Sequence, residues 1–277
     1  MPFSAPLTTI VTGTLAGGPG RNQDHVVVGD SVVALLDGAT SWLPQAPARD
    51  GGWYARTLGA SLTTRLEDSD RTVAQILADA ITEVRDRYDL TAGDAPSSTV
   101  TIARWSQDAI EIYALGDSPA VIYPRQGEAI LVRDERLDEV ATGYRTAYLE
   151  HLKAGYGFND RLAALMSELQ TAERPQRNRP GGYWIAESDP AAASHAVTAT
   201  FPRNEVLAVL LASDGVSADV MDYHRNDWPD VYEFLTQASP STYLRNIHAA
   251  EEADVDGRWW PRAKRHDDKT LAWIGLD

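Results

Sequence analysis

Four apolar, strand-like runs in this sequence each carry an aspartate at one end. Three of them run into an acid, "VVALLDGA" at Asp37, "IEIYALGDS" at Asp117 and "VLAVLLASDG" at Asp214, and the fourth, "RHDDKTLAWI", begins just after Asp267. A single such end is ordinary turn chemistry, because Asp and Gly are favoured in turns. Four in one chain, with Asp24 before a further apolar run, predict that carboxylates converge at one edge of a sheet structure.

Convergent carboxylates repel one another unless cations lie between them. The chain has no cysteine and only six scattered histidines, so its ligands would be oxygen atoms, which suit hard ions such as Mg²⁺ or Mn²⁺. Two such ions about 3.5–4 Å apart can activate a water molecule and hold a phosphoryl group in line with it. The acids therefore predict a Mg²⁺ or Mn²⁺ site suited to phosphoryl chemistry.

The net charge of −15 argues against nucleic acid or an anionic membrane as a general partner, since phosphate surfaces demand stripes of Lys and Arg. Solubility alone explains such an excess of acid, unless part of it is gathered in a cation site. No apolar run approaches the roughly 18 residues of a membrane span, and the N-terminus lacks the features of an export signal. The absence of cysteine suits the cytosol, and we expect a cytoplasmic protein.

The order of elements favours an α+β fold with antiparallel sheets, because strands come in clusters instead of alternating with helices. With no repeat or linker, residues 1–277 are expected to form one domain. Alternating or continuous apolar patterns predict strands at 26–28, 32–36, 98–104, 110–115, 120–123, 206–212 and 269–274. Helical spacing predicts helices at 53–67, 71–88, 137–153, 161–173, 231–237 and 241–253, with a further helix start at 188–190.

The ordered series "NQD … DGA … SST … GDS … SDG … DDKT" resembles the metal-dependent protein phosphatases of type 2C, over residues 21–274. No single motif is specific, but the ordered set is. The resemblance implies a central sandwich of two antiparallel β-sheets flanked by helices, with metal ions in a cleft at one end. It also implies hydrolysis of phosphoserine and phosphothreonine in proteins by a metal-activated water, without a phosphoenzyme.

The resemblance further implies which residues hold the ions. Asp37 matches the acid that bridges two metals, with Asp214 and Asp267 completing one ion. Asp24 and the carbonyl of Gly38 match the ligands of the other ion. On this basis Asp37, Asp214 and Asp267 are also the expected catalytic residues.

The Gly-Asp-Ser motif invites two interpretations. In some bacterial members of the family the matching acid, here Asp117, shares a third and weaker ion with Asp214. Ser118 would instead be the nucleophile of a serine esterase, but that class carries its Gly-Asp-Ser near the N-terminus and an Asp-x-x-His pair that this sequence lacks. A third possibility, a non-catalytic binding module of the same fold, usually loses metal acids that this chain keeps. Chelator sensitivity of any hydrolysis separates the three.

Departures from the family pattern concern the substrate more than the metal. Pro19 stands where the family commonly has a phosphate-holding Arg, and Ala39 stands where some members have a His. Pro119 follows the Gly-Asp-Ser motif in place of Arg, and Asp268 replaces an Asn. A helical insertion at about 133–199 replaces the usual short flap. A small phosphorylated metabolite is therefore the alternative to a phosphorylated protein as substrate.

Several arginines are candidates for the missing phosphate contact, because the guanidinium fork binds phosphate in a bidentate manner. The other interpretation is a solvated or ion-paired surface. Trp184 is either a core residue or, if exposed, part of a lid, and His266 is a candidate to support Asp267. The candidate substrate-binding residues are Arg21, Arg177, Arg179, Arg262 and Arg265.

Overall fold

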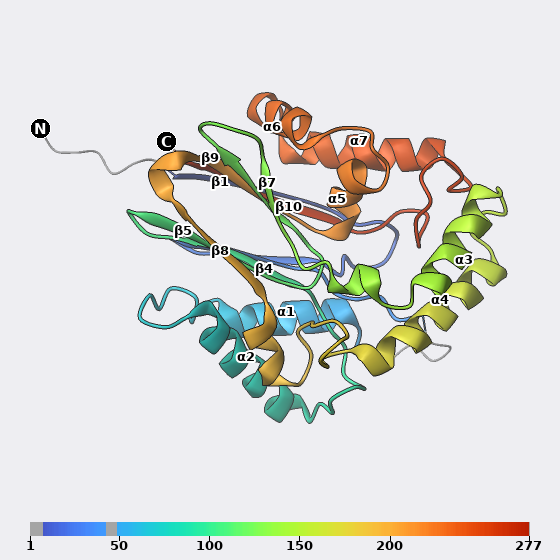
Figure 1. The fold of residues 1–277 in the computed structure, drawn as a ribbon, viewed down its shortest axis with the longest axis horizontal. Helices are drawn as coiled ribbons and strands as arrows, with labels where there is room; N and C mark the ends of the chain where they lie inside the picture. The colour runs from blue at the N-terminus through green and yellow to red at the C-terminus, as the bar shows by residue number, and fades with distance from the viewer. Residues whose placement is uncertain (1–7, 43–48, 277) are drawn as a thin grey trace, which may run out of the picture.

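The computed structural model describes residues 8–42 and 49–276, and two antiparallel sheets of five strands form its centre (Figure 1). The first sheet has the order β1 (Thr8–Leu15), β10 (Lys269–Leu276), β9 (Val206–Ala212), β6 (Ala120–Pro124) and β7 (Ile130–Val132). The second has the order β2 (His25–Val28), β3 (Val32–Leu36), β4 (Val100–Trp105), β5 (Ala109–Leu115) and β8 (Val197–Pro202). This is the predicted α+β sandwich.

Helices cover the outer face of each sheet, as Figure 1 shows. The first sheet packs against α5 (Asp214–Met221), α6 (Trp228–Gln237) and α7 (Pro240–Ala253). The second packs against α1 (Gly51–Leu62) and α2 (Val73–Tyr88). The remaining two helices, α3 (Thr142–Lys153) and α4 (Asp160–Glu173), lie side by side beyond one end of the sandwich (Figure 1).

Strand β3 explains why two layers form, because all five of its residues are buried. Side chains alternate between the faces of a strand. Val33 and Leu35 therefore enter the core between the sheets, while Ala34 and Leu36 face α1 and α2. A continuous apolar strand needs cover on both faces, and the second sheet and the helix pair supply it.

Most predicted elements are confirmed within a few residues of their ends, but the predictions missed several elements. Strands β1, β7 and β8 were not predicted, and α5 begins at Asp214, where only a turn was expected. The helix start expected at 188–190 is a short 3₁₀ helix, Pro190–His195, in which the Asp189 side chain accepts the N–H of Ala191. Other 3₁₀ turns are at Arg136–Glu139, Arg174–Gln176 and Arg203–Glu205.

The insertion at 133–199 is helical in α3 and α4, as predicted, and its last residues enter the sandwich as the start of β8. Trp184 is 7% exposed and stacks on His195 with ring centroids 3.4 Å apart. The lid interpretation of Trp184 is therefore wrong, and the core interpretation holds. Helix α4 is tied to the segment after Gly38, because the Gln170 side chain donates to the carbonyl of Thr40 and accepts the N–H of Trp42.

Within the residues that the structure describes, no helix has both the length and the apolar character needed to cross a membrane.

Candidate metal centre

The register of the second sheet brings Asp24 and Asp37 together. Strands β2 and β3 are antiparallel, and His25 pairs with Leu36. Asp24 comes directly before His25, and Asp37 directly after Leu36, so the two acids are the next positions on neighbouring strands. The strand edge alone therefore places two carboxylates at the same end of the sheet.

The first sheet does the same with Asp214 and Asp267. Leu271 of β10 pairs with Ala212 of β9, and the ladder continues as Ser213 N–H donates to the Thr270 carbonyl at 2.9 Å. Asp214 and Asp267 lie just beyond these residues at the same end of the sheet. Asp214 is also the first residue of α5, so its backbone N–H is free of helical bonding.

One hydrogen bond joins the two pairs of acids across the sheets. The backbone N–H of Asp214 donates to Asp37 Oδ2 at 3.1 Å. The charges of Asp214 and Asp267 both act on Asp24, and those of Asp24 and Asp267 act on Asp37. The structure thus brings together Asp24, Asp37, Asp214 and Asp267, as the sequence predicts.

The protonation behaviour of this cluster fits a cation site. Burial and the charges of Asp214 and Asp267 raise the pKa of Asp24 to about 7. Burial and the charges of Asp24 and Asp267 raise the pKa of Asp37 well above its usual range. The surrounding protein and the charges of Asp37 and Asp267 also raise the pKa of Asp214, whose side chain reaches the surface. Positive charge between these carboxylates would favour their ionised forms.

An unpartnered atom points to the same conclusion. Asp24 is 8% exposed, and its Oδ2 atom is buried without a hydrogen-bond partner. A buried polar atom without a partner is costly in a native protein, so such an atom calls for a ligand that is absent from the chain itself. A hard divalent cation such as Mg²⁺ or Mn²⁺ suits an all-oxygen donor set.

Lys264 is a functional candidate that the sequence analysis missed. Its ammonium group lies 2.6 Å from Asp267 Oδ1. Burial would lower the pKa of Lys264, but the charges of Asp267 and Asp214 outweigh burial and raise it. A protein cation therefore neutralises part of the acid cluster. The signal in the sequence was a lysine three residues before a predicted ligand, in a basic segment that was interpreted either as surface or as a source of substrate-binding arginines.

The "SST" and "GDS" motifs hold Asp37 in place. Ser98 Oγ donates to the carbonyl of Asp37 at 2.9 Å, and Thr99 N–H donates to the same carbonyl at 2.9 Å. Thr99 Oγ1 in turn lies 2.8 Å from Ser118 Oγ, which is fully buried. This arrangement supports the interpretation of Ser118 as a turn residue, since a buried hydroxyl bonded to Thr99 is not presented to a substrate.

Gly38 lies where α1 begins, and the close approach of two backbones explains the glycine. A Cβ atom at Gly38 would collide with the backbone of Gly51 and Gly52. Gly51 is the first residue of α1, after the N-cap Asp50. The segment that carries Asp37 is thus packed directly against the N-terminus of α1.

Asp117 is at the margin of the cluster. Burial raises its pKa, while the charges of Arg133 and Arg145 lower it. Its own charge adds to the rise in the pKa of Asp214, so the two carboxylates face a common region. A third ion shared by Asp117 and Asp214 stays a prediction, and arginines from the insertion lie near the same place.

Two residues beside Asp267 brace the loop that carries it. Asp268, which replaces the family's Asn, accepts the N–H groups of Gly17 at 2.8 Å and Gln23 at 2.9 Å. Lys269 is fully buried and donates to the Asp267 carbonyl at 2.8 Å and to Glu251 Oε2 at 2.7 Å. Glu251 was not singled out from the sequence, because an acid within a helical pattern is ordinarily a surface residue.

His266 contacts this brace instead of Asp267. Its Nδ1 lies 3.1 Å from Glu251 Oε2, and its ring stacks on His248. The expected support of Asp267 by His266 is therefore indirect, through Glu251 and Lys269.

Comparison with known proteins decides the family. The family model described as "Protein phosphatase 2C" matches residues 20–249, which is most of the chain and includes Asp24, Asp37, Asp117 and Asp214. The chain belongs to the protein phosphatase 2C family. No curated protein matches the sequence at a significant level.

Solved structures show the same fold at low sequence identity. The catalytic domain of the serine/threonine phosphatase PstP, in complex with two manganese ions, is 15% identical, with a TM-score of 0.56 over 98% of this chain and 99% of that one. Stp1 from Staphylococcus aureus is 13% identical, with a TM-score of 0.57 over 98% and 96%. The phosphatase MsPP from Mycobacterium smegmatis, in complex with cacodylate, is 18% identical, with a TM-score of 0.53 over 99% and 100%.

Within this phosphatase 2C fold, the predicted arginines have different surroundings. Arg177 is paired with the buried Glu187 at 3.1 Å, and Arg262 is 8% exposed and paired with Asp254 at 3.1 Å. Both guanidinium groups are thus occupied inside the protein. Arg179 and Arg265 are exposed. Among the described residues, none of these four arginines forms a hydrogen bond with Asp24, Asp37, Asp214 or Asp267.

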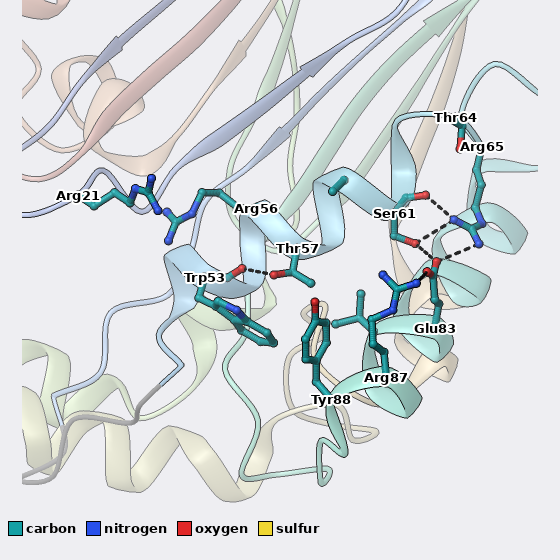
Figure 2. Close-up of a pocket in the computed structure, with 12 residues that line it drawn as sticks. Arg21, Trp53, Arg56, Thr57, Ser61, Thr64, Arg65, Glu83, Arg87 and Tyr88 are labelled. Carbon is teal, nitrogen blue, oxygen red and sulfur yellow. Dashed lines mark hydrogen bonds and ion pairs between the residues drawn. The ribbon is translucent and has the colours of Figure 1, made fainter.

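Arg21 is different, because it is exposed three residues before Asp24 and lies beside Arg56 (Figure 2). Arg56 was missed by the sequence analysis, since an Arg on the polar face of a helix is ordinarily solvated. Its Nη1 donates to the Asn22 carbonyl at 3.1 Å, which fixes it against the "NQD" segment.

Proposed function

We propose that this protein phosphatase 2C family member hydrolyses phosphoserine and phosphothreonine in proteins, with two divalent ions, Mg²⁺ or Mn²⁺, at its acid cluster. The observation that carries the proposal is the convergence of four carboxylates from the ends of two sheets, joined by the Asp214–Asp37 hydrogen bond at 3.1 Å. Asp37 is the proposed shared ligand, because the charges of both Asp24 and Asp267 act on it. Asp214 and Asp267 would complete one ion, and Asp24 with the Gly38 carbonyl the other.

The bound ions would supply a nucleophilic water at neutral pH and neutralise charge on the phosphoryl group. The chain's own residues hold the metal ligands in place. The Asp37 carbonyl is held by Ser98 and Thr99, which fixes the backbone that carries this side chain. Lys269 holds the Asp267 carbonyl, and Lys264 neutralises Asp267. Rigid ligands of this kind keep their geometry while charge develops on the substrate.

Arg21 and Arg56 are the proposed phosphate contacts in place of the family arginine that Pro19 replaces. They lie side by side next to the "NQD" segment, and neither belongs to an ion pair of the described residues. Arg177 and Arg262 are less suited to this role, because each would first have to leave a buried acid. A single-domain enzyme in the cytoplasm, without nucleic acid or membrane partners, stays a prediction from composition, and a small phosphorylated metabolite stays the alternative substrate.

The test is the hydrolysis of p-nitrophenyl phosphate and of a phosphothreonine peptide by the wild type and by Asp37→Asn. Loss of a shared metal ligand should cost about 4 kcal/mol of transition-state stabilisation, a fall of roughly a thousandfold in kcat/KM. Chelator should abolish the wild-type activity, and added Mn²⁺ should restore it. Activity in Asp37→Asn that equals the wild type, or activity indifferent to chelator, would overturn the proposal.

A further inference from the structure

A pocket of about 520 Å³ is lined by residues of α1 and α2 together with Arg21 (Figure 2). Four arginines and one glutamate reach it, and two aromatic rings form part of its wall. In a chain with a net charge of −15, this concentration of positive charge needs an explanation. The charged residues are Arg21, Arg56, Arg65, Arg87 and Glu83.

At one end of the pocket a single carboxylate serves two arginines. Glu83 lies 2.9 Å from Arg65 and 2.9 Å from Arg87. The Arg87 side chain is 63% exposed, so its guanidinium has N–H groups directed to solvent. This end keeps a net positive charge after its internal pairing, and a second anion would find two guanidinium groups already held in place.

At the other end Arg21 and Arg56 are neighbours, and neither forms an ion pair with an acid of the described residues. Burial and the charge of Arg21 lower the pKa of Arg56, and Asp50 offsets this only in part. Arg56 is fixed by its bond to the Asn22 carbonyl. Adjacent guanidinium groups repel one another, and an anion between them would relieve the repulsion and accept hydrogen bonds from both, so this end also has the character of an anion site.

The wall between the two ends is fixed by packing. Trp53 and Tyr88 meet edge to face with centroids 4.9 Å apart, and the Arg49 guanidinium lies 5.1 Å from both rings. Thr57 Oγ1 donates to the Trp53 carbonyl at 2.7 Å. A site that is shaped before binding loses less side-chain freedom on binding.

The pocket begins beside the metal centre and leads away from it. Arg21 is three residues from Asp24, and a Cβ atom on Gly52 would lie 2.7 Å from the Cα of Gln23. Arg65 follows Arg56 by nine residues along the chain, just past the end of α1. Six helical steps separate Arg56 from Leu62, about 9 Å along α1 at 1.5 Å per residue, and the turn that carries Arg65 follows. An extended peptide spans this stretch with roughly three or four residues.

We propose that the α1–α2 pocket is a substrate subsite, in which Arg65 and Arg87 bind a second anionic side chain of a phosphoprotein, about three or four residues from the phosphorylated one. The inference rests on the proposed function, because it assumes that the phosphorylated residue itself is held at the metal centre beside Arg21 and Arg56. The shared chemistry of the second group is that of an anion, either a carboxylate or another phosphate.

A peptide scan tests the inference. A neutral phosphothreonine peptide receives one Glu at each position from one to six residues on either side, and kcat/KM is measured with Mn²⁺. We expect a maximum about fivefold above the neutral peptide, three to five residues away on one side only. Phosphoserine in place of Glu at that position separates the two sources, because a larger gain identifies a second phosphate and an equal gain identifies a simple anion site.

Arg87→Gln is the decisive variant, because Glu83 keeps Arg65 as a partner when Arg87 is lost. The preference for the acidic peptide should fall from about fivefold to less than twofold. Arg85→Gln is the matched control on the same helix, since Arg85 pairs with the neighbouring Asp86 and does not line the pocket. This control should keep the full preference.

The possible outcomes distinguish a failure of the proposed subsite from a failure of the proposed phosphatase activity. A flat peptide scan with efficient turnover overturns the subsite and leaves the phosphatase intact. Equal loss of preference in Arg87→Gln and Arg85→Gln also overturns it, because the effect would then be one of general surface charge. No turnover of any phosphopeptide or of p-nitrophenyl phosphate overturns the proposed function itself.

Discussion

The acids of the candidate metal centre and the candidate substrate-binding arginines of this protein are positioned in different ways. The acids lie at strand ends, where antiparallel register fixes each one relative to the next, as in the pairing of His25 with Leu36 beside Asp24 and Asp37. The arginines lie on helices, on the loop before β2 and in the insertion, where their direction depends on whichever partner they meet. Arg177 turns inward to Glu187, while Arg56 reaches the Asn22 carbonyl.

This difference shows which part of a site a sequence can reveal. A strand end has one place in a sheet, so a pattern of acids after apolar runs carries three-dimensional information. A long flexible side chain has many rotamers, and its sequence neighbours say little about its final contact. We therefore expect changes at the acid end to act on metal binding and stability, and changes at the arginines to act on the substrate.

The largest expected effect concerns the brace beneath the acid end. Glu251→Gln leaves the fully buried Lys269 ammonium without its carboxylate, and loss of one partner of a buried pair costs about 3–5 kcal/mol. Urea unfolding of the metal-free protein measures this loss. The double variant Glu251→Gln with Lys269→Met should recover much of it, because no unpaired charge remains. A loss below 1 kcal/mol in the single variant would mean that the brace does not hold the acid end.

The next effect is a dependence of stability on pH in the metal-free protein. Since the folded pKa of Asp24 is about 7 and its ordinary value is 3.8, the folded state binds more protons between these values than the unfolded state. The free energy of unfolding should therefore fall as the pH rises from 4 to 8, by roughly 2–4 kcal/mol from this group. Unfolding at pH 5 and pH 8 in chelator measures it, and saturating Mn²⁺ should remove the difference. Equal stability at both pH values would contradict the crowded, ionisable cluster.

Lys264→Gln tests whether the lysine competes with a metal ion for Asp267. The ammonium group 2.6 Å from Asp267 competes with a cation for that carboxylate, so its removal should tighten Mn²⁺ binding by roughly tenfold. The same variant should lower the stability of the metal-free protein, because the acids lose a neutralising charge. Calorimetry and thermal unfolding measure the two effects. Weaker Mn²⁺ binding in the variant would show that Lys264 supports the loaded site instead of competing with it.

The smallest effect is expected on the arginine side. Arg21→Gln should raise KM for a phosphopeptide by roughly threefold to tenfold with little change in Mn²⁺ affinity, because an exposed guanidinium contributes modestly to binding. Arg179→Gln is the control on another exposed arginine, and its KM should be unchanged. A KM increase in Arg179→Gln as large as that in Arg21→Gln would contradict the proposal that the substrate binds on the α1 side of the metal centre.

Local patterns predicted antiparallel sheets and the convergence of the four central acids, because apolar runs and the acids beside them can be recognised in the sequence. The sandwich of two sheets was predicted from the resemblance to the phosphatase family. The sequence analysis missed β1, in which half-exposed and exposed positions such as Val11 give no apolar run. It missed α5 because the sequence "SDG" is equally typical of a turn and of a helix start, and the structure shows that Ser213 is the N-cap of α5. Glu251 could not be predicted, since it meets Lys269 only after the chain has folded distant segments together. Lys264 carried one local signal, its place three residues before Asp267.

The most direct test of the central claim is a calorimetric titration of Mn²⁺ into the wild type and Asp37→Asn, together with thermal unfolding of both metal-free proteins. If acids from the two sheets form one metal centre, the wild type binds at least two ions, and the variant loses the binding of both. Its metal-free form should be at least as stable as the wild type, because an amide places no ionisable group in this buried position beside Asp24 and Asp267. Unchanged Mn²⁺ stoichiometry and affinity in a folded Asp37→Asn protein would contradict the account.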